Sequence, residues 1–390
     1  MICSPRRLPR ANAISRAMNM NTLRLLLAGA IISVLLTACS DSEPVFHEED
    51  RPLRLSAWNL FSLSENEFSP SDSSLVFRPA NQLFTDYALK LRTLWIPAGT
   101  QAKIVDDEIQ YPIGTILSKT FYYPSDVDGQ LIKQTGSDAG QIDLQFNQLI
   151  ETRLLVNKAT GWDAFPYVWN DEQTEAFLRV AGASKPISLG GVVGNDSEGD
   201  NLDFVYFVPN ENQCSGCHTT SHPDGGMHPL GAVLSQLSSK VYNSEGVLQL
   251  QTELMQARGW LDDIPSGFET SSWSDTSLGI DERAMAYLNI HCGHCHNPEG
   301  AADTSALILD GSHELAVNMG VCKPPVAAGG GAGDLLYSIV PGAPDRSILL
   351  FRMNSQAPDE MMPELGRSLI HHEGVELISR WIEELAGGCG

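Results

Sequence analysis

The stretch Asp281–His296 reads DERAMAYLNIHCGHCH and joins an amphipathic segment directly to a closely spaced pair of cysteines. Two acidic residues open the segment, where they suit the positive end of a helix dipole. Apolar side chains follow at Ala284, Tyr287 and Leu288, a spacing that places them on one helical face. The pattern predicts a helix over 281–290 that ends at the cysteine pair.

The motif Cys-x-x-Cys-His that closes this stretch occurs twice, at 214–218 and at 292–296. Two thiols this close can add to the two vinyl groups of one porphyrin, and the next residue then presents an imidazole to the iron. Paired Cys-x-x-Cys units also bind zinc, but a zinc ribbon does not need a histidine directly after each pair. A redox Cys-x-x-Cys would call for a thioredoxin-like βαβ context, which the sequence pattern lacks. We therefore predict two covalently bound c-type haems.

Six residues carry this prediction. The cysteines provide the thioether bonds and each following histidine is the axial iron ligand, whose other ring nitrogen usually donates to a carbonyl or carboxylate. The predicted residues are Cys214, Cys217, His218, Cys292, Cys295 and His296.

The first forty residues have the form of an export signal. Five arginines and no acidic residue accompany an apolar run at 25–36, which is shorter than the roughly 18 residues that span a bilayer. The signal is already complete if translation starts at Met18 or Met20. The run ends in Leu-Thr-Ala-Cys39, which resembles the bacterial lipoprotein processing box; an ordinary signal peptide is the alternative. The resemblance implies a signal peptide at 1–38, a lipidated Cys39, a polar tether at 39–50, and a periplasm-facing lipoprotein of the outer membrane.

Charge argues against nucleic acid as a partner. The 390 residues include 25 Lys and Arg against 48 Asp and Glu, a formal net charge of -23. Removal of 1–38 would leave 20 basic against 48 acidic residues, or -28. Affinity for a phosphate backbone depends on positive charge, so we expect no nucleic-acid binding and assign the acidity to solubility. A hydrophobic content of 42% is ample for a core.

The segment before the first motif has the composition of β-structure. Ile150–Val156, Tyr167–Trp169 and Phe204–Val208 are β-branched or aromatic runs, each bounded by turn residues, and a further run covers Thr115–Tyr123. We predict a mainly antiparallel β domain at 51–212, followed by a first-haem segment at 213–275. The sheet is either a wall of the haem site or a docking domain.

A second amphipathic stripe covers 372–385, and Met361-Met362-Pro363 lies in a non-helical stretch before it. The order of a helix, haem cysteines, a Met-Pro loop and a Trp-bearing last helix resembles a class I cytochrome c domain. The resemblance implies that 276–390 is a mostly α-helical class I cytochrome c-like domain and that Met362 is an axial ligand, with Met361 as the adjacent alternative. A methionine pair that only fills the core is the other interpretation. The expected fold class is therefore α+β, a β domain followed by a helical cytochrome domain.

The chain also resembles a family of exported two-haem c-type cytochromes of Gram-negative bacteria that is largely uncharacterised. The similar stretches lie at 283–310, 320–328 and 339–381, and the upstream phrases QLFTDYALKLR, YPIGTILSKTF and ETRLLVNKATGWDAFPYVWN extend the similarity over nearly the whole mature chain. The resemblance implies electron transfer between periplasmic redox proteins, with a parallel β-helix protein as one partner. It implies no particular substrate.

The sixth ligand of the first haem is left open by the sequence. His222, Met227 and His228 all follow His218 within ten residues, and a remote residue is the alternative. If that position is vacant, the chain becomes a diheme peroxidase-type enzyme or a gas-binding haem protein. No acid–base group for such chemistry is evident, so we expect an electron carrier and assign no catalytic residue.

The remaining histidines and cysteines have other expected roles. His291 and His294 are expected to tune the edge of the second haem or to face solvent. Four histidines are expected at the surface: His47, His313, His371 and His372. An oxidising compartment and an even count suggest a disulfide between Cys322 and Cys389, with two free thiols as the alternative.

Overall fold

The computed structural model describes residues 43–134, 140–190, 201–242, 246–312, 315–326 and 328–390. Within this range, Glu43–Gly390 is one compact unit. The expected signal peptide, the lipidated Cys39 and His313 lie outside the described residues. None of the helices that the structure describes is both long and apolar enough to cross a bilayer.

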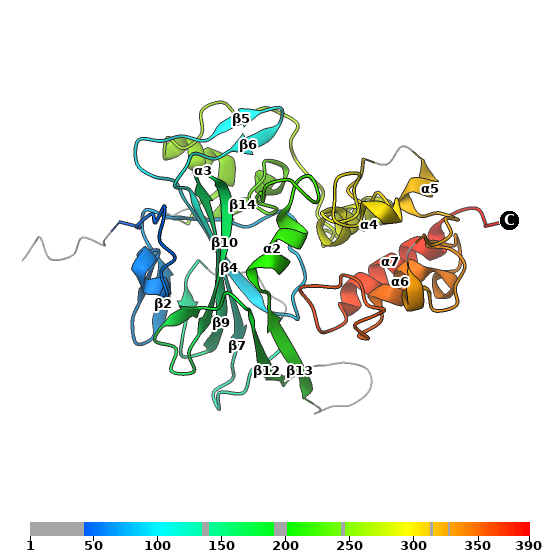
Figure 1. Ribbon diagram of the computed structural model, residues 1–390, viewed down its shortest axis with the longest axis horizontal. Helices are drawn as coiled ribbons and strands as arrows, with labels where there is room; N and C mark the ends of the chain where they lie inside the picture. Colours follow the sequence, from blue (N-terminus) through cyan, green and yellow to red (C-terminus); the bar gives the residue numbers. More distant parts are fainter. Residues whose placement is uncertain (1–42, 135–139, 191–200, 243–245, 313–314, 327) are drawn as a thin grey trace, which may run out of the picture. The chain divides into compact units, whose positions relative to one another are not determined.

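A six-stranded antiparallel sheet in the order β11-β10-β9-β7-β4-β3 forms the centre of the N-terminal half (Figure 1). The four apolar runs that suggested β-structure lie in β7, β9, β10 and β13. The strands of this sheet are β3 (Leu75–Val76), β4 (Leu89–Trp95), β7 (Ile116–Pro124), β9 (Asn147–Lys158), β10 (Gly161–Trp169) and β11 (Ala176–Leu178).

Smaller antiparallel sheets surround the central one. A three-stranded sheet joins β1 (Phe61–Leu63), β2 (Glu67–Pro70) and β8 (Ile142–Asp143). Three two-stranded sheets are formed by β5 (Lys103–Val105) with β6 (Glu108–Gln110), β12 (Ala183–Leu189) with β13 (Leu202–Val208), and β14 (Lys240–Tyr242) with β15 (Leu248–Leu250).

The alternation of side chains along the strands gives the central sheet two different faces. On one face, Leu91, Leu154 and Tyr167 pack with Trp58 in a large apolar core. On the other face, Leu94, Leu117 and Leu155 belong to a second core. The second face continues into a cavity described below.

Helices occur mainly after the sheet. They are α2 (Glu211–His218), α3 (Gln251–Ala257), α4 (Ile280–Leu288), α5 (Ala316–Met319), α6 (Ile348–Met353) and α7 (His372–Glu384). The two amphipathic patterns at 281–290 and 372–385 thus coincide with α4 and α7, and the Met-Pro loop between α6 and α7 is not helical. The Trp381 indole donates to Asp281 at 2.9 Å and joins these two helices.

The prediction of a mostly α-helical class I cytochrome c-like domain at 276–390 is wrong. The protein is 21% helical and 27% strand, mostly antiparallel, and its C-terminal part has few helices. Between α4 and α6 the only α-helix in the described residues is the four-residue α5. The reason is composition, because glycines and prolines recur from Pro298 to Pro344, and both residues interrupt helices. The order of the elements resembled a class I cytochrome, but most of this segment is irregular.

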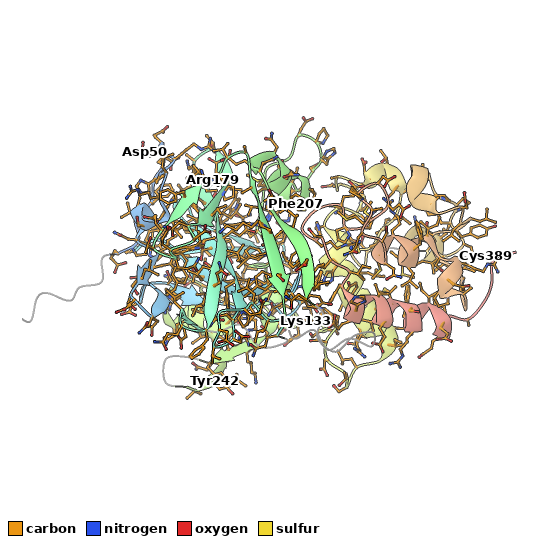
Figure 2. The ribbon with its side chains drawn as sticks, turned by 90° about the horizontal axis from the view of Figure 1, so that it is seen from below. Asp50, Lys133, Arg179, Phe207, Tyr242 and Cys389 are labelled. Carbon is orange, nitrogen blue, oxygen red and sulfur yellow. A yellow bond between two sulfur atoms is a disulfide. The ribbon has the colours of Figure 1, made fainter. Side chains whose placement is uncertain are left out.

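The C-terminal segment contains a disulfide between Cys322 and Cys389, residues that are 67 apart in sequence. Figure 2 places Cys389 at the far end of this segment, beyond α7. The bond ties the chain terminus to the loop after α5. This pairing is the one expected from the compartment and the cysteine count.

The loop at 81–88, just before β4, holds the C-terminal segment against the sheet. The Asp86 carboxylate accepts backbone N–H bonds from Ser368 and Leu369 at 2.7 and 2.8 Å. The Tyr87 hydroxyl binds Glu373 of α7 at 3.0 Å, and Lys133, which Figure 2 labels, reaches the same carboxylate at 3.3 Å. We call residues 81–88 the latch loop.

Candidate haem-binding sites

The first motif lies on α2, whose start is fixed by a reciprocal cap. The Asn210 side chain accepts from the backbone N–H of Gln213, and the Gln213 side chain accepts from the N–H of Asn210, both at 2.9 Å. Cys214, Cys217 and His218 then occupy positions i, i+3 and i+4 of the helix. Residues with this spacing share one helical face, so the motif presents both thiols and the imidazole on the same side.

His218 is held with one ring nitrogen available. Its Nδ1 donates to the carbonyl of His228 at 2.7 Å, and the His228 ring and backbone N–H in turn donate to the His218 carbonyl at 2.8 Å each. Burial lowers the pKa of His218 to about 4. The imidazole is therefore neutral at pH 7, the form that binds a metal, and Nε2 is left as its donor atom.

The second motif follows α4 through a π-helical turn at Asn289–Gly293. The backbone N–H groups of Cys295 and His296 both donate to the carbonyl of Cys292, at 3.1 and 2.8 Å, so that the chain continues to turn. A side chain at Gly293 would place its Cβ 2.7 Å from the Cα of Asp310, which requires glycine inside the motif.

His296 is oriented in the same manner as His218, but by a hydroxyl group. Its Nδ1 donates to Ser305 Oγ at 3.0 Å, and that hydroxyl donates onward to the carbonyl of Ala302 at 2.7 Å. Burial lowers the pKa of His296 to about 4, so this imidazole is also neutral at pH 7. Both predicted axial histidines thus keep Nε2 free for a metal.

The two motifs meet in space although they are about eighty residues apart. Cys217 of the first motif and His294 and Cys295 of the second bring one ligand atom each within 4.8 Å of one another. The Cys295 thiol lies 3.6 Å from the carbonyl of Gly216. A hydrogen bond from the Cys295 thiol lowers the pKa of Cys217, with a further contribution from His294. All four motif cysteines are free thiols.

Two cavities adjoin this meeting point. The first, of about 410 Å³, contains Cys214, Cys217 and His218 in its wall. The second, of about 520 Å³, contains Cys295 and His296. Both volumes lie within the range of roughly 300–1,000 Å³ that is usual for cofactor sites. The walls share eight residues: Cys217, His291, Cys292, His294, Met353, Met362, Pro363 and Leu365.

The Met-Pro loop contributes to the walls of both cavities. Met362 lines both of them, whereas Met361 lines neither. The loop is held by Arg367, which is 7% exposed and donates from Nη2 to the carbonyls of Met362, Arg352 and Ser355 at 2.8, 3.1 and 3.0 Å. A single buried guanidinium therefore fixes the backbone on which Met362 stands.

The three nearby candidates for the sixth ligand of the first site are placed differently. His222 is exposed, and neither His222 nor Met227 lines the two cavities. His228 lines the first cavity, but its Nδ1 is turned toward the backbone of His218, the residue it supports.

His371 is not where the sequence suggested, whereas His291 lines both cavities. His291 was expected at a haem edge or in solvent; it is 3% exposed, donates from Nδ1 to the carbonyl of Tyr287 and accepts at Nε2 from the N–H of Phe84. His371 was expected at the surface, but it is 9% exposed, lines the first cavity and stacks on Phe84 at 4.3 Å. Phe84 of the latch loop contacts both histidines, although it precedes them by more than two hundred residues in the sequence. His47 and His372 are not buried.

Several residues in the cavity walls belong to none of the motifs recognised in the sequence. Phe84, Tyr287 and Arg367 lie in the wall of the first cavity, together with Lys119 and Arg153 from the central sheet. A signal for the last two exists in the sequence, since each is a charged residue inside an apolar β segment, ILSKTFYY and LIETRLLV. A charge at an inward strand position is costly unless something pairs with it.

No family model, no curated protein and no solved structure matches this chain.

Proposed function

We propose that this chain is a two-haem c-type cytochrome that relays electrons between periplasmic redox proteins from a lipid anchor at Cys39. The first haem would be held by Cys214 and Cys217, with His218 as an iron ligand. The second would be held by Cys292 and Cys295, with His296 and Met362 as iron ligands. A parallel β-helix protein remains a proposed partner, on the resemblance alone.

The donor set and its surroundings support a porphyrin iron at each motif. Each motif combines two free thiols with a neutral histidine whose Nδ1 is already bonded, and each opens on a cavity of cofactor size. The protein binds the ring through the thiols, orients each imidazole through Nδ1, and excludes water with the apolar walls. The iron supplies the change of redox state, and a thioether ligand such as Met362 favours its reduced form.

The observation that carries the proposal is the meeting of Cys217, His294 and Cys295 within 4.8 Å. If each thiol is bonded to a porphyrin edge, the two rings approach one another at those edges. Two redox groups held this closely, with shared walls between them, are suited to passing electrons from one to the other. This proximity supports electron transfer between the two sites.

The test is to count and classify the haems in the exported protein. We expect two haems per chain that stay attached under denaturing conditions, two separate one-electron potentials, and magnetic coupling between the two ferric irons in electron paramagnetic resonance. Cys214→Ala and Cys292→Ala should each weaken retention of one haem. Protein that is isolated from the periplasm with no bound haem would contradict the proposal.

Zinc binding is the competing interpretation of the same cluster. Two thiols and an imidazole within 4.8 Å are also a partial zinc site. Metal analysis separates the two: stoichiometric zinc without iron would favour this alternative. In that case a His294→Ala variant would lose the metal, whereas His218→Ala and His296→Ala would keep it.

A vacant position at the first haem is the second candidate, and one observation favours it. Two of the histidines in the wall of the first cavity, His291 and His371, have both ring nitrogens directed at other groups. A high-spin ferric signal that changes with cyanide would support small-ligand binding or peroxide chemistry there. Two low-spin haems without peroxide turnover would exclude it.

A further inference from the structure

Three cations stand side by side across the central sheet. Arg92 of β4 is directly opposite Lys119 of β7, and Lys119 is directly opposite Arg153 of β9. All three line the first cavity, together with Cys214, Cys217 and His218. Like charges directly opposite one another on neighbouring strands destabilise a sheet. We call these residues the cation row.

The carboxylate of Glu151 pairs with Arg153, the cation at one end of the row. Glu151 is fully buried and binds the Arg153 guanidinium at 2.6 and 2.8 Å, and it also accepts from the Tyr206 hydroxyl at 2.6 Å. Both carboxylate oxygens of Glu151 therefore already accept hydrogen bonds. Glu151 belongs to the same sheet face but is not part of the cavity wall.

Lys119, at the centre of the row, lacks such a partner. Within the described residues its ammonium makes neither a hydrogen bond nor an ion pair, and lies 4.9 Å from the centre of the Phe121 ring. Burial lowers the pKa of Lys119 well below its usual range, and the neighbouring arginines lower it further. Lys119 is half-buried, and a cation that is partly withdrawn from water without a counter-charge is unfavourable, so an anion that enters from the cavity would stabilise the row.

We propose that the cation row binds the two propionate carboxylates of the first haem. This inference rests on the proposed function. Thioether bonds to Cys214 and Cys217 would fix the vinyl edge of the ring, which leaves the propionate edge to be held by polar groups elsewhere in the wall. Lys119 and Nη1 of Arg153, whose Nε and Nη2 already bind Glu151, provide donors of the right charge for a carboxylate. The same row would also attract a free carboxylate or another small anion, so the test must separate the two sources.

The test compares Lys119→Met with a matched control in the full-length protein carrying both haems. Lys103→Met makes the same change of charge and size at an exposed position on β5, outside both cavities. Lys119→Arg keeps the charge in place. The readouts are haem content, the propionate bending modes in resonance Raman spectra, and the two reduction potentials.

We expect Lys119→Met to shift the propionate mode of one haem and to lower its potential. Loss of a nearby positive charge favours the ferric state; a tenfold change in the reduction equilibrium corresponds to about 59 mV. Lys119→Arg should restore both signals, and Lys103→Met should leave both as in the wild type. In a Cys214→Ala/Cys217→Ala background without the first haem, Lys119→Met should raise Tm, because it relieves the repulsion within the row.

Three outcomes would overturn the inference. In the first, the loaded Lys119→Met protein keeps the wild-type propionate modes and potentials. In the second, the modes do not move, but added acetate or nitrite binds the wild type and loses about tenfold in affinity in the variant; a free anion would then occupy the row. In the third, the wild type contains no haem, which overturns the proposed function as well and is recognised from the haem count.

Discussion

Met362 is the residue whose role can be tested most directly. A thioether bound to ferric iron gives a sulfur-to-iron absorption band and raises the potential. We expect Met362→Leu to abolish this band and to lower one potential, with little change in stability because the two side chains are similar in volume. Met353→Leu is the control, since Met353 also lines both cavities. A band that survives in Met362→Leu and disappears in Met353→Leu would assign the ligand to Met353.

We expect Arg367 to position Met362 without being an iron ligand itself. Its guanidinium donates to four backbone carbonyls, those of Met362, Leu369, Arg352 and Ser355. Arg367→Met would remove these side-chain donors, and of the four carbonyls that of Arg352 would keep the N–H of Met362; we expect a cost of roughly 1–3 kcal/mol. We expect lower stability in denaturant titrations together with a weaker sulfur-to-iron band. A loss of stability with an unaltered band would show that Arg367 supports the fold and does not position Met362.

At the scale of elements, the packing of α4 on α7 depends on one glycine. A Cβ at Gly374 would lie 2.1 Å from the Tyr287 hydroxyl oxygen. Gly374→Ala should therefore destabilise the protein by roughly 1–3 kcal/mol through overpacking, although alanine is the better helix former. Thermal melts of Gly374→Ala and of Gly388→Ala provide the comparison, because nothing lies within 4 Å of a Cβ at Gly388. Equal Tm values for the two variants would contradict this account of the packing.

What could be predicted from the sequence was local. The spacing of apolar residues gave α4 and α7, the β-branched runs gave β7, β9, β10 and β13, and the Cys-x-x-Cys-His spacing gave the cavity residues on α2. The burial of His371 could not be predicted, because it depends on Phe84, which lies far away in the chain. The fold class of 276–390 was predicted wrongly because element order was given more weight than the glycines and prolines between the helices.

At the scale of the whole molecule, the latch loop makes the attachment of the C-terminal segment depend on pH. Burial raises the pKa of Asp86 from 3.8 to about 6, against the effect of its two N–H donors. Between these values the folded chain holds a proton that the unfolded chain releases. The stability that Asp86 contributes therefore falls as pH rises from about 4 to 6, by at most about 3 kcal/mol, and is constant above that range.

Asp86→Asn removes this titration and isolates its effect. We expect the difference in unfolding free energy between wild type and Asp86→Asn to shift in favour of the variant as pH rises from 4 to 6. Denaturant titrations of both proteins at several pH values measure this difference. Parallel stability curves over that range would contradict a raised pKa at Asp86.

The closeness of Cys217 and Cys295 also has a consequence for how the protein is made. In an oxidising compartment, two free thiols within 4.8 Å can form a disulfide with one another instead of bonding to a porphyrin. We therefore expect haem delivery to come before the two motifs fold together, since a chain that folds first can seal both attachment sites with a single bond. Chains produced without haem supply should then weigh 2 Da less than the fully reduced form for each such bond, and unchanged thiol counts in them would contradict this order of events.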